Sequence, residues 1–465
     1  MGLSQWWPKV KEDTMETKKE GKVNRGQWAS SIGFVMAAAG AAVGLGNVWK
    51  FPYLTALHGG GTFLFAYILM LLFLGIPVLV TEMVLGRKGK LDPVGTYSKL
   101  SGGSGFWKFV GYVAISVNFI VLSFYSVVGG WITNYMFQYI TGGIKGDIVE
   151  YFGGFVSNPY SPLLWYAIFM GMTIYIVAQG VSAGIERASN IMMPTLFLLF
   201  IILAIRAVTL PGAIEGIKYY LLPDFSKLSG TTFLMAMGQV FFSLNIGAGC
   251  TMTYASYLSD DENIPKMSLQ VPLLDFLAAF LAGIIIIPSV FAFNLDPAAG
   301  PPLLFITMPF VFGNMPLGVL FGLMFFVLML FAALTSSISM LEVNTSFLVD
   351  NYKIDRKKAA LTAGFFIFLL GIPSSLAQGV LSNFAIFGLD FLSAMDFLAS
   401  YILMPFGAFM MTIFLVRVLG LDEAIKEATN DGTIPFKIKE LWSFLVKYVV
   451  PIIIILVFLS SVGLI

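Results

Sequence analysis

The sequence predicts an all-α polytopic membrane protein. Of its 465 residues, 58% are hydrophobic and 11% are charged, whereas soluble domains carry about 25% charged residues. Apolar runs long enough to cross a bilayer, about 20 residues each, follow one another along most of the chain. Two of these runs are interrupted near the middle by glycine and asparagine. We therefore expect a bundle of membrane helices of which two are broken.

We predict eleven transmembrane helices, arranged as two sets of five and one further helix. Their approximate ranges are 28–57, 62–85, 107–140, 163–179, 190–210, 231–258, 266–293, 317–348, 359–372, 384–419 and 444–465. Because each set has an odd number of helices, the second set enters the membrane from the opposite side, which gives an inverted repeat. The predicted parts are a tail at 1–27, a transporter core at 28–419 with repeats at 28–210 and 231–419, a linker at 420–443, and the eleventh helix at 444–465.

Lysine and arginine predict the orientation in the membrane. With the N-terminus inside, 22 of these residues fall on the inner side and four on the outer side, in agreement with the positive-inside rule. The N-terminus is therefore expected in the cytoplasm and the C-terminus outside.

The tail at 1–27 lacks the apolar core of a signal peptide. Nucleic acid is not an expected partner, because the basic residues are scattered through short loops.

The two interrupted spans are the first and the sixth. The first contains Gly40, Gly44, Gly46 and Asn47, and the sixth contains Asn245, Gly247 and Gly249. Lipid cannot hydrogen-bond irregular backbone, which survives at membrane depth only where protein or a watery cavity receives it. A single pair of glycines commonly serves close helix packing. Two breaks five spans apart, each beside an asparagine, instead favour a binding site where the half-helices meet.

Hydroxyl groups in the eighth span indicate a cation site. The run AALTSSISM contains Ala332, Thr335, Ser336 and Ser337. Such hydroxyls often bond only to their own helix, but together with carbonyls freed by a broken helix they make an all-oxygen cage. Hard cations prefer oxygen ligands, and a cage without a carboxylate suits a monovalent ion better than calcium.

Four ionisable side chains lie at membrane depth, namely Lys50, Glu82, Asp275 and Asp396. Charge is costly there, so a functional role is the first hypothesis for each. Glu82 lies near the inner end of its span, where a structural pairing is equally open. Lys50 and Asp396 fall in outer halves and could pair across a cavity mouth. The hydroxyl of Tyr125, in an otherwise apolar span, belongs either to a site or to aromatic packing.

The chain resembles the neurotransmitter:sodium symporter family, in its bacterial LeuT-like branch. The resemblance extends over residues 25–419 and rests on four motifs. They are AAVGLGNVWKFPY with the glycines at 59–61, FFSL followed by TYASY in the sixth span, LTSS in the eighth, and MDF at 395–397. It implies a LeuT-type 5+5 inverted repeat in a bacterial plasma membrane, in a variant with eleven spans.

The resemblance implies two sodium ions. One would be held by the carbonyls of Gly40, Val43 and Ala332 and the hydroxyls of Thr335 and Ser336. The other would be held by the carbonyl of Ala42, the amide of Asn47, Ser243, the side chain of Asp275 and the substrate carboxylate. That carboxylate would also meet the N–H groups of Leu45 and Gly46, which form an anion site at a half-helix start, and the hydroxyl of Tyr125.

The resemblance also implies an amino-acid substrate. Family members that carry biogenic amines have an aspartate where this chain has Gly44. The substrate amine would face the carbonyls of Ala42, Phe242 and Ser243, and its side chain would lie among Ala41, Val121, Phe242, Asn245, Ala248, Ser336 and Met340. The small Ala248 leaves room for a large hydrophobic or aromatic side chain, although Met340 could fill that space.

The family pattern assigns gates to both sides of the site. Phe242 and Tyr125 would form a lid, Lys50 and Asp396 would close the outside, and Arg25 and Trp28 with Asp350 would close the inside. Three residues depart from the pattern. Lys50 replaces an arginine and lacks its planar fork, which predicts a looser gate. Asp275 replaces an asparagine and supplies the negative charge that animal relatives take from chloride, so chloride is not expected. Asn245 replaces a smaller residue and changes the hydrogen-bonding character of the pocket.

The function expected is sodium-coupled symport of amino acids by alternating access. A sensor that binds an amino acid with sodium but does not transport it remains an alternative, as does an amino-acid transporter that is not coupled to sodium. A channel would need a continuous polar stripe, whereas the polar groups here cluster at one depth. An enzyme is not expected, because the chain has one histidine and one cysteine and no pattern of catalytic residues. The partners expected are the amino acid and the lipid bilayer.

Overall fold

The computed structural model describes residues 26–296 and 303–464, and the regular elements within them are helices. Nine described helices are long and apolar enough to cross a membrane, and the pair Ser31–Ala42 and Gly46–Leu57, bent by 52° at its break, counts as a tenth. The prediction of an all-α polytopic membrane protein is confirmed. The sixth predicted span, at 231–258, is not counted on this basis because it is divided into two short helices, so a total of eleven is not confirmed.

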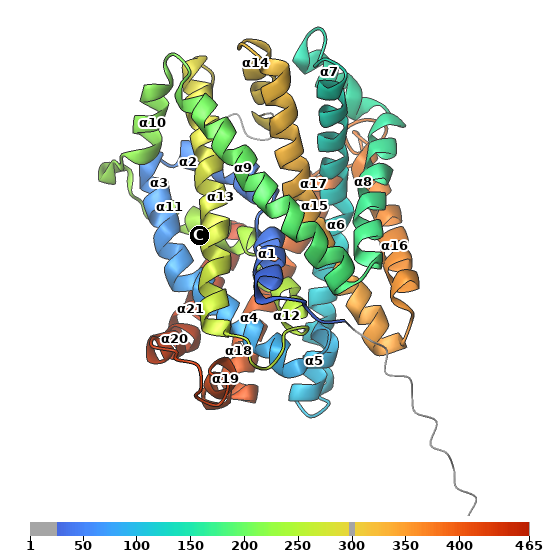
Figure 1. The fold of residues 1–465 in the computed structure, drawn as a ribbon, viewed down its shortest axis with the longest axis vertical. Helices are drawn as coiled ribbons and strands as arrows, with labels where there is room; N and C mark the ends of the chain where they lie inside the picture. The colour runs from blue at the N-terminus through green and yellow to red at the C-terminus, as the bar shows by residue number, and fades with distance from the viewer. Residues whose placement is uncertain (1–25, 297–302, 465) are drawn as a thin grey trace, which may run out of the picture.

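The helices follow one another as labelled in Figure 1. In the first half of the chain they are α1 (Ser31–Ala42), α2 (Phe51–Leu57), α3 (Gly61–Met70), α4 (Ile76–Gly89), α5 (Pro93–Leu100), α6 (Gly105–Ile140), α7 (Ile148–Ser157), α8 (Ser161–Ala178), α9 (Arg187–Val208) and α10 (Ala213–Leu221). In the second half they are α11 (Gly230–Ser243), α12 (Cys250–Ala255), α13 (Ile264–Ala292), α14 (Met308–Gly313), α15 (Gly318–Tyr352), α16 (Arg356–Leu376), α17 (Phe391–Asp396), α18 (Met404–Phe414), α19 (Leu421–Ala428), α20 (Lys439–Phe444) and α21 (Val450–Ser461). Short π-helical turns extend several of these helices, and these turns and the 3-10 turn Phe225–Lys227 are labelled η.

The first break follows directly from the local sequence. Ser30 caps α1 by accepting a hydrogen bond from the Gly33 N–H, and the helix stops at Val43, whose backbone is extended (φ −69°, ψ 100°). The chain resumes as the π-helical turn η1 (Gly46–Lys50) and then α2. The predicted break in this span is therefore confirmed.

The second break separates α11 from α12 and depends on left-handed backbone. Asn245, Gly247 and Gly249 have φ values of 51°, 82° and 79°, which glycine adopts freely and asparagine tolerates. A Cβ on Gly247 would lie 2.6 Å from the Ala408 backbone nitrogen, so a side chain has no room there. The Gly247 N–H, freed from a helix, donates to Glu82 Oε1 at 3.0 Å. This break is confirmed as well.

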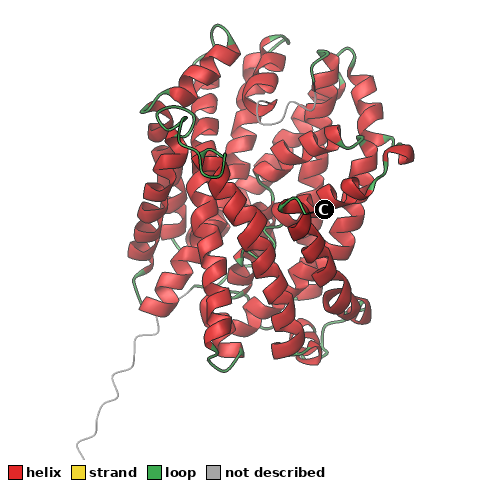
Figure 2. Cartoon of the chain, turned by 180° about the vertical axis from the view of Figure 1, so that it is seen from behind, coloured by secondary structure: helices red, strands yellow, loops and turns green. Residues whose placement is uncertain are grey.

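Two long helices, α6 and α15, form the centre of the bundle. They pack along each other, and α15 also contacts α8, α9, α12 and α16. The half-helix α1 packs against α9, α13, α15 and α12, which places it in the middle of the molecule (Figure 1). Figure 2 shows the opposite side of the same bundle, where helices again run between the two ends.

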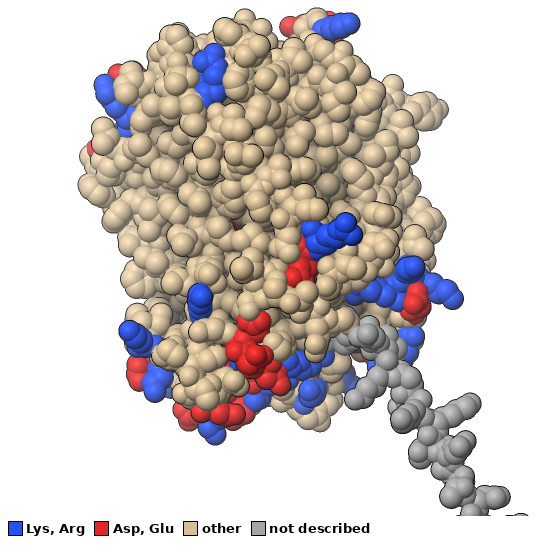
Figure 3. Space-filling model, in the orientation of Figure 1, with Lys and Arg blue, Asp and Glu red and all other residues tan. Residues whose placement is uncertain are grey.

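The surface agrees with a membrane setting. Most charged side chains on the face in Figure 3 gather toward its two ends, apart from one blue and red group near the middle, and uncharged side chains cover most of the surface between the ends. This distribution keeps most of the charge out of the hydrocarbon layer, where it is costly.

Several helix boundaries differ from the sequence expectation. The fifth span begins at Val181 with the π-helical turn η3 (Val181–Glu186), nine residues before the predicted 190. The tenth begins at Phe391, where Asp390 accepts a hydrogen bond from the Ser393 N–H, rather than at 384. Helix α12 ends at Ala255, three residues before the predicted end. Hydropathy alone does not detect such caps and turns.

Candidate functional site

A small cavity lies where the two broken helices meet. Its volume is about 20 Å³, enough for about one water molecule. Its walls come from the α1 break, α6, the α11 break, α15 and the tenth span. The lining residues are Ala42, Gly44, Leu45, Gly46, Val121, Tyr125, Phe242, Ser243, Asn245, Ser336, Met340, Ser400 and Met404. The structure therefore shows a narrow chamber between elements far apart in sequence.

Most residues predicted for the substrate pocket line this cavity, but Ala41 and Ala248 do not. The Ala41 carbonyl accepts a hydrogen bond from Asn245 Nδ2 at 2.8 Å. The Ala248 carbonyl accepts one from Asn118 Nδ2 at 2.6 Å. Both alanines thus support the chamber wall through their backbone. Asn245 joins the two breaks directly, because its side chain reaches from one to the other.

The predicted all-oxygen cage is assembled between α1 and α15. The Ser336 hydroxyl oxygen lies 3.4 Å from the carbonyl oxygens of both Gly40 and Val43 and 3.3 Å from that of Ala332. The Thr335 hydroxyl oxygen lies 3.1 Å from the same Ala332 oxygen. All five residues are buried. This set of carbonyl and hydroxyl oxygens has the chemistry that a hard monovalent cation prefers.

A buried carboxylate occupies the other side of the first break. Asp275 is 0% exposed. It accepts hydrogen bonds from Asn47 Nδ2 at 2.7 Å, from Ser243 Oγ at 2.9 Å and from the Tyr67 hydroxyl at 3.2 Å. All three donors are neutral, and among the described residues no cationic side chain lies within 4.0 Å of this carboxylate. A buried charge is costly unless it is paired, so a cation bound here would balance Asp275.

The polypeptide between α1 and η1 brings backbone groups to the cavity. The Leu45 N–H donates to the Tyr125 hydroxyl at 3.3 Å, and the Gly44 N–H donates to Asn47 Oδ1 at 2.9 Å. The Gly46 carbonyl accepts from Gln239 Nε2 at 2.9 Å. Polar backbone atoms at membrane depth are thereby directed at side chains that line or border the chamber.

Gly44 has no space for a side chain. A Cβ there would lie 2.6 Å from Ser336 Oγ and 3.0 Å from the Tyr125 hydroxyl. The residues that surround Gly44 are thus the same ones predicted to contact sodium and the substrate carboxylate.

The structure does not bring the two predicted outer-gate residues into an ion pair. The Lys50 ammonium lies 4.5 Å from the ring centroid of Phe242 and 5.6 Å from that of Tyr401, which are cation–π distances. Asp396 instead accepts a hydrogen bond from Ser400 Oγ at 2.6 Å. Lys50 thereby contacts Phe242, the predicted lid residue, rather than the Asp396 carboxylate.

The predicted inner gate is described in part. Trp28 Nε1 donates to the Tyr254 carbonyl at 2.9 Å, and its ring packs edge-on against Phe34 and Tyr254. This contact joins the start of α1 to α12. Asp350 Oδ2 accepts from the Asp92 N–H at 2.8 Å. Arg25 lies outside the described residues, so its role stays a prediction.

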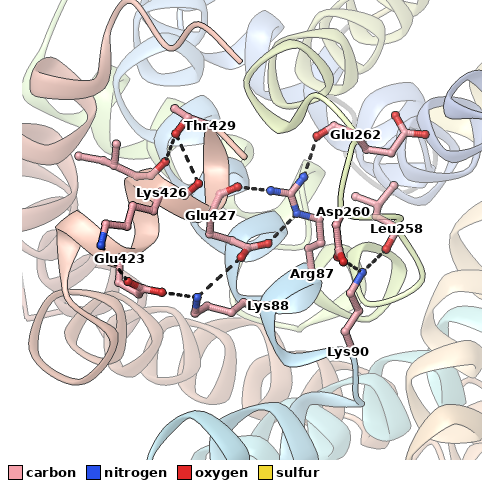
Figure 4. Close-up of polar contacts among 11 residues, drawn as sticks. Arg87, Lys88, Lys90, Leu258, Asp260, Glu262, Glu423, Lys426, Glu427 and Thr429 are labelled. Carbon is pink, nitrogen blue, oxygen red and sulfur yellow. Dashed lines mark hydrogen bonds and ion pairs between the residues drawn. The ribbon is translucent and has the colours of Figure 1, made fainter. Parts of the chain in front are cut away.

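An ion-pair network lies around the C-terminal end of α4 (Figure 4). Arg87 contacts Glu427 Oε1 at 2.7 Å and donates to the Glu262 carbonyl at 2.7 Å. Lys88 contacts Glu423 at 2.6 Å. The network ties the end of α4 to α19 and to the loop that follows α12.

Several site residues were not predicted from sequence. Tyr67 donates to Asp275, and Gln239 donates to the Gly46 carbonyl at the first break. Ser400 and Met404 line the cavity. The first three are polar groups in apolar spans, which is the signal that singled out Tyr125. Met404 carries no such signal in the sequence.

Comparison with known proteins gives consistent matches over most of the chain. The family model described as the sodium:neurotransmitter symporter family matches residues 25–146 and 161–464. The sodium-dependent transporter YhdH of Bacillus subtilis (strain 168) is 42% identical over 94% of this chain and 98% of its own length. A sodium-dependent transporter of Haemophilus influenzae is 37% identical over the same shares. A crystal structure of MhsT in complex with L-phenylalanine is 41% identical, with a TM-score of 0.86, and covers 94% of this chain and 100% of that one.

Proposed function

This chain belongs to the sodium:neurotransmitter symporter family and is a sodium-dependent transporter of the membrane, and we propose that it couples sodium to the uptake of amino acids with large hydrophobic or aromatic side chains. The observation that carries the proposal is the narrow chamber at the two breaks. It combines backbone N–H groups outside the helical hydrogen-bond pattern, an all-oxygen cage and a buried carboxylate within one set of contacting residues. A zwitterion and sodium ions supply the charges that such a set lacks.

The substrate class follows from the chamber walls. Gly44 leaves no room for a side chain that would replace the substrate carboxylate, so the substrate brings its own. The Leu45 N–H and the Tyr125 hydroxyl, which are 3.3 Å apart at the chamber wall, would receive it. Val121, Phe242, Met340 and Met404 add an apolar wall. That MhsT is solved with L-phenylalanine supports a large apolar side chain here.

We propose that two sodium ions couple to the substrate through the first break. One would bind the cage at Thr335 and Ser336, and the other would bind beside Asp275 and share the substrate carboxylate. A ligand shifts a conformational equilibrium only by its different affinity for the two states. Sodium would order the chain between α1 and η1 and favour the outward-facing form, and the substrate would then permit closure with Phe242 and Lys50 as a lid.

The test of transport is amino-acid uptake into proteoliposomes. With sodium outside and potassium inside, labelled phenylalanine, leucine or tryptophan should accumulate, and collapse of the sodium gradient should abolish accumulation. Sodium-dependent binding without uptake would make the protein a sensor. Uptake that ignores the sodium gradient would contradict the coupling.

The cage can be tested separately. Thr335→Ala with Ser336→Ala should raise the sodium concentration that half-saturates substrate binding, by about tenfold if one net cation contact of roughly 1.4 kcal/mol is lost. Ser346→Ala is the matched control, because Ser346 carries a buried hydroxyl on the same helix, and among the described residues this hydroxyl bonds only to the Val343 carbonyl. An unchanged sodium dependence in the double variant would remove both residues from the ion site.

The charge of Asp275 predicts the anion requirement. We propose that this carboxylate takes the place of chloride, so uptake should be equal in chloride and gluconate media. Asp275→Asn keeps the shape of the side chain and removes its charge, and it should make uptake respond to chloride. A wild-type protein that needs chloride would contradict the proposal.

We also propose that the N-terminus is cytoplasmic and the C-terminus outside. Tags attached to the two ends, probed from each side of the membrane, would test this orientation.

A further inference from the structure

A groove separate from the chamber runs between the tenth and eleventh spans. It lies between α18 with its extension η7 (Leu415–Leu419) and α21 with the preceding turn η8 (Leu445–Val449), and α18 packs against α21. Its volume is about 670 Å³, and it is lined by Phe409, Thr412, Ile413, Val416, Arg417, Leu421, Lys447, Tyr448 and Pro451. This volume falls within the range of small-molecule sites, about 300–1,000 Å³.

Two cations share this groove, and neither has an acidic partner. Arg417 and Lys447 are exposed and belong to helices that are apolar enough to span the membrane. Among the described residues, no carboxylate lies within 4.0 Å of either side chain. Asp422, close by in sequence, is exposed and forms no ion pair in the same set. The Lys447 ammonium lies 5.1 Å from the centroid of the Tyr448 ring.

Several neighbouring basic residues are instead paired with acids. Lys88 and Lys426 contact Glu423 at 2.6 and 3.9 Å, and Lys439 contacts Glu440 at 3.8 Å. The groove therefore presents positive charge that no described carboxylate neutralises. Near the membrane surface, such charge attracts acidic lipid headgroups.

We propose that the groove binds an anionic phospholipid. Arg417 and Lys447 would hold its phosphate, and the apolar side chains of Phe409, Ile413 and Val416 would contact an acyl chain. Basic pockets between membrane helices bind acidic lipid headgroups, and Tyr448 is an aromatic residue of the kind found at the membrane–water interface. A lipid suits this groove better than a soluble anion, because most of its lining is apolar and it opens between two spans.

The proposal can be tested on the purified full-length protein by native mass spectrometry with phosphatidylglycerol or phosphatidylcholine of the same acyl chains. Phosphatidylglycerol should bind more tightly. Arg417→Gln with Lys447→Gln should weaken that binding by roughly 25-fold, about fivefold for each cation near the membrane surface. The variant's binding of phosphatidylcholine should not change.

The matched control is Lys357→Gln with Lys358→Gln, which removes the same charge from exposed positions at the start of α16 and should leave phosphatidylglycerol binding unchanged. Equal unfolding temperatures of both variants in phosphatidylcholine would show that the fold is intact. Equal binding of phosphatidylglycerol by the two variants would overturn the proposal. Equally strong displacement by inorganic phosphate would also overturn it, because the groove would then bind a soluble anion and not a lipid.

Discussion

At Gly44, the space around one Cα limits what the chamber can hold. The two nearest polar atoms, Ser336 Oγ and the Tyr125 hydroxyl, come from α15 and α6. Each also contacts the broken backbone, Ser336 at Gly40 and Val43 and Tyr125 at Leu45. A side chain at this position would therefore displace groups on both the ion side and the substrate side.

We predict that Gly44→Ala weakens amino-acid binding at saturating sodium. Overpacking of a tight site costs about 1–3 kcal/mol, which corresponds to about a 5- to 150-fold loss of affinity. Equilibrium binding of labelled substrate measures the effect. Gly238→Ala is the control, because a Cβ there meets nothing within 4 Å. Equal affinities of the two variants would contradict this prediction, because the chamber would then have to widen at Gly44 when substrate binds.

At the scale of elements, the second break is held by a neighbouring helix. Glu82 on α4 is 1% exposed and accepts the Gly247 N–H at 3.0 Å. This contact replaces the helical hydrogen bond that the break removes, as irregular backbone at membrane depth requires. Helix α4 therefore serves as a support for the unwound part of α11 and α12.

Glu82→Ala should lower the free energy of unfolding by about 1–3 kcal/mol, because it leaves the buried Gly247 N–H without an acceptor. Glu82→Gln keeps an oxygen at the same place and should lose less. Thermal unfolding in detergent distinguishes the two variants. Glu215→Ala removes an exposed glutamate that pairs with Lys218 and should have little effect. A Gln variant as unstable as the Ala variant would argue that the charge, and not the acceptor, is needed.

Helix α5, which lies between two spans, carries a carboxylate that responds to pH. Asp92 is 0% exposed, caps α5 by accepting from the Val94 N–H at 2.9 Å, and accepts from Asn351 Nδ2 at 2.8 Å. Burial, and then the nearby charge of Asp350, raises the pKa of Asp92 from 3.8 to about 7. The folded protein thus binds this proton more tightly than the unfolded chain does.

The stability contribution of Asp92 should therefore be complete below about pH 4 and should be lost as the pH rises to about 7. The free energy of unfolding should fall by up to about 1.4 kcal/mol per pH unit in this window. Asp92→Asn keeps a capping oxygen and should flatten the slope, as measured by thermal unfolding at pH 5, 6 and 7. Asp355→Asn, which changes the exposed N-cap residue of α16, should retain the slope. An identical slope in Asp92→Asn would assign the effect to another group.

At the scale of the whole molecule, Arg87 joins segments that are far apart in the chain. Its side chain is 1% exposed, pairs with Glu427 on α19 and donates to the Glu262 carbonyl after α12. Glu262 in turn accepts a hydrogen bond from the Ser31 hydroxyl at the start of α1 at 2.7 Å. The network in Figure 4 therefore connects α19, in the linker before the last span, to the loop that follows α12, and the Ser31 contact extends it to the start of α1.

Arg87→Ala should lower the free energy of unfolding by about 3 kcal/mol, as expected when one partner of a buried ion pair is removed. Arg87→Lys should recover only part of this loss, because lysine cannot present a planar fork to two acceptors. Lys426→Ala, at the exposed pair with Glu423, should cost less than about 1 kcal/mol. Chemical or thermal unfolding gives the comparison. Full recovery by lysine would show that only the charge matters at this position.

Much of the architecture could be predicted from local sequence. Runs of apolar residues located the spans, and glycine with asparagine located both breaks, because these signals act within a few residues of each other. Most of the proposed pocket and ion ligands followed from the family motifs. The predicted pairing of Lys50 with Asp396 is absent from the structure. Local sequence could not decide it, since it depends on how far the tenth span lies from the first.

The sequence by itself determined that the chain is a helical membrane protein with two interrupted helices, because hydropathy and backbone freedom are properties of neighbouring residues. The tertiary structure decided which groups meet at the interruptions. Tyr67 and Ser243 reach Asp275, Glu82 reaches Gly247, and Met404 lines the chamber. These contacts join residues up to hundreds of positions apart, and only the packing of the helices fixes which of them lie within hydrogen-bonding distance.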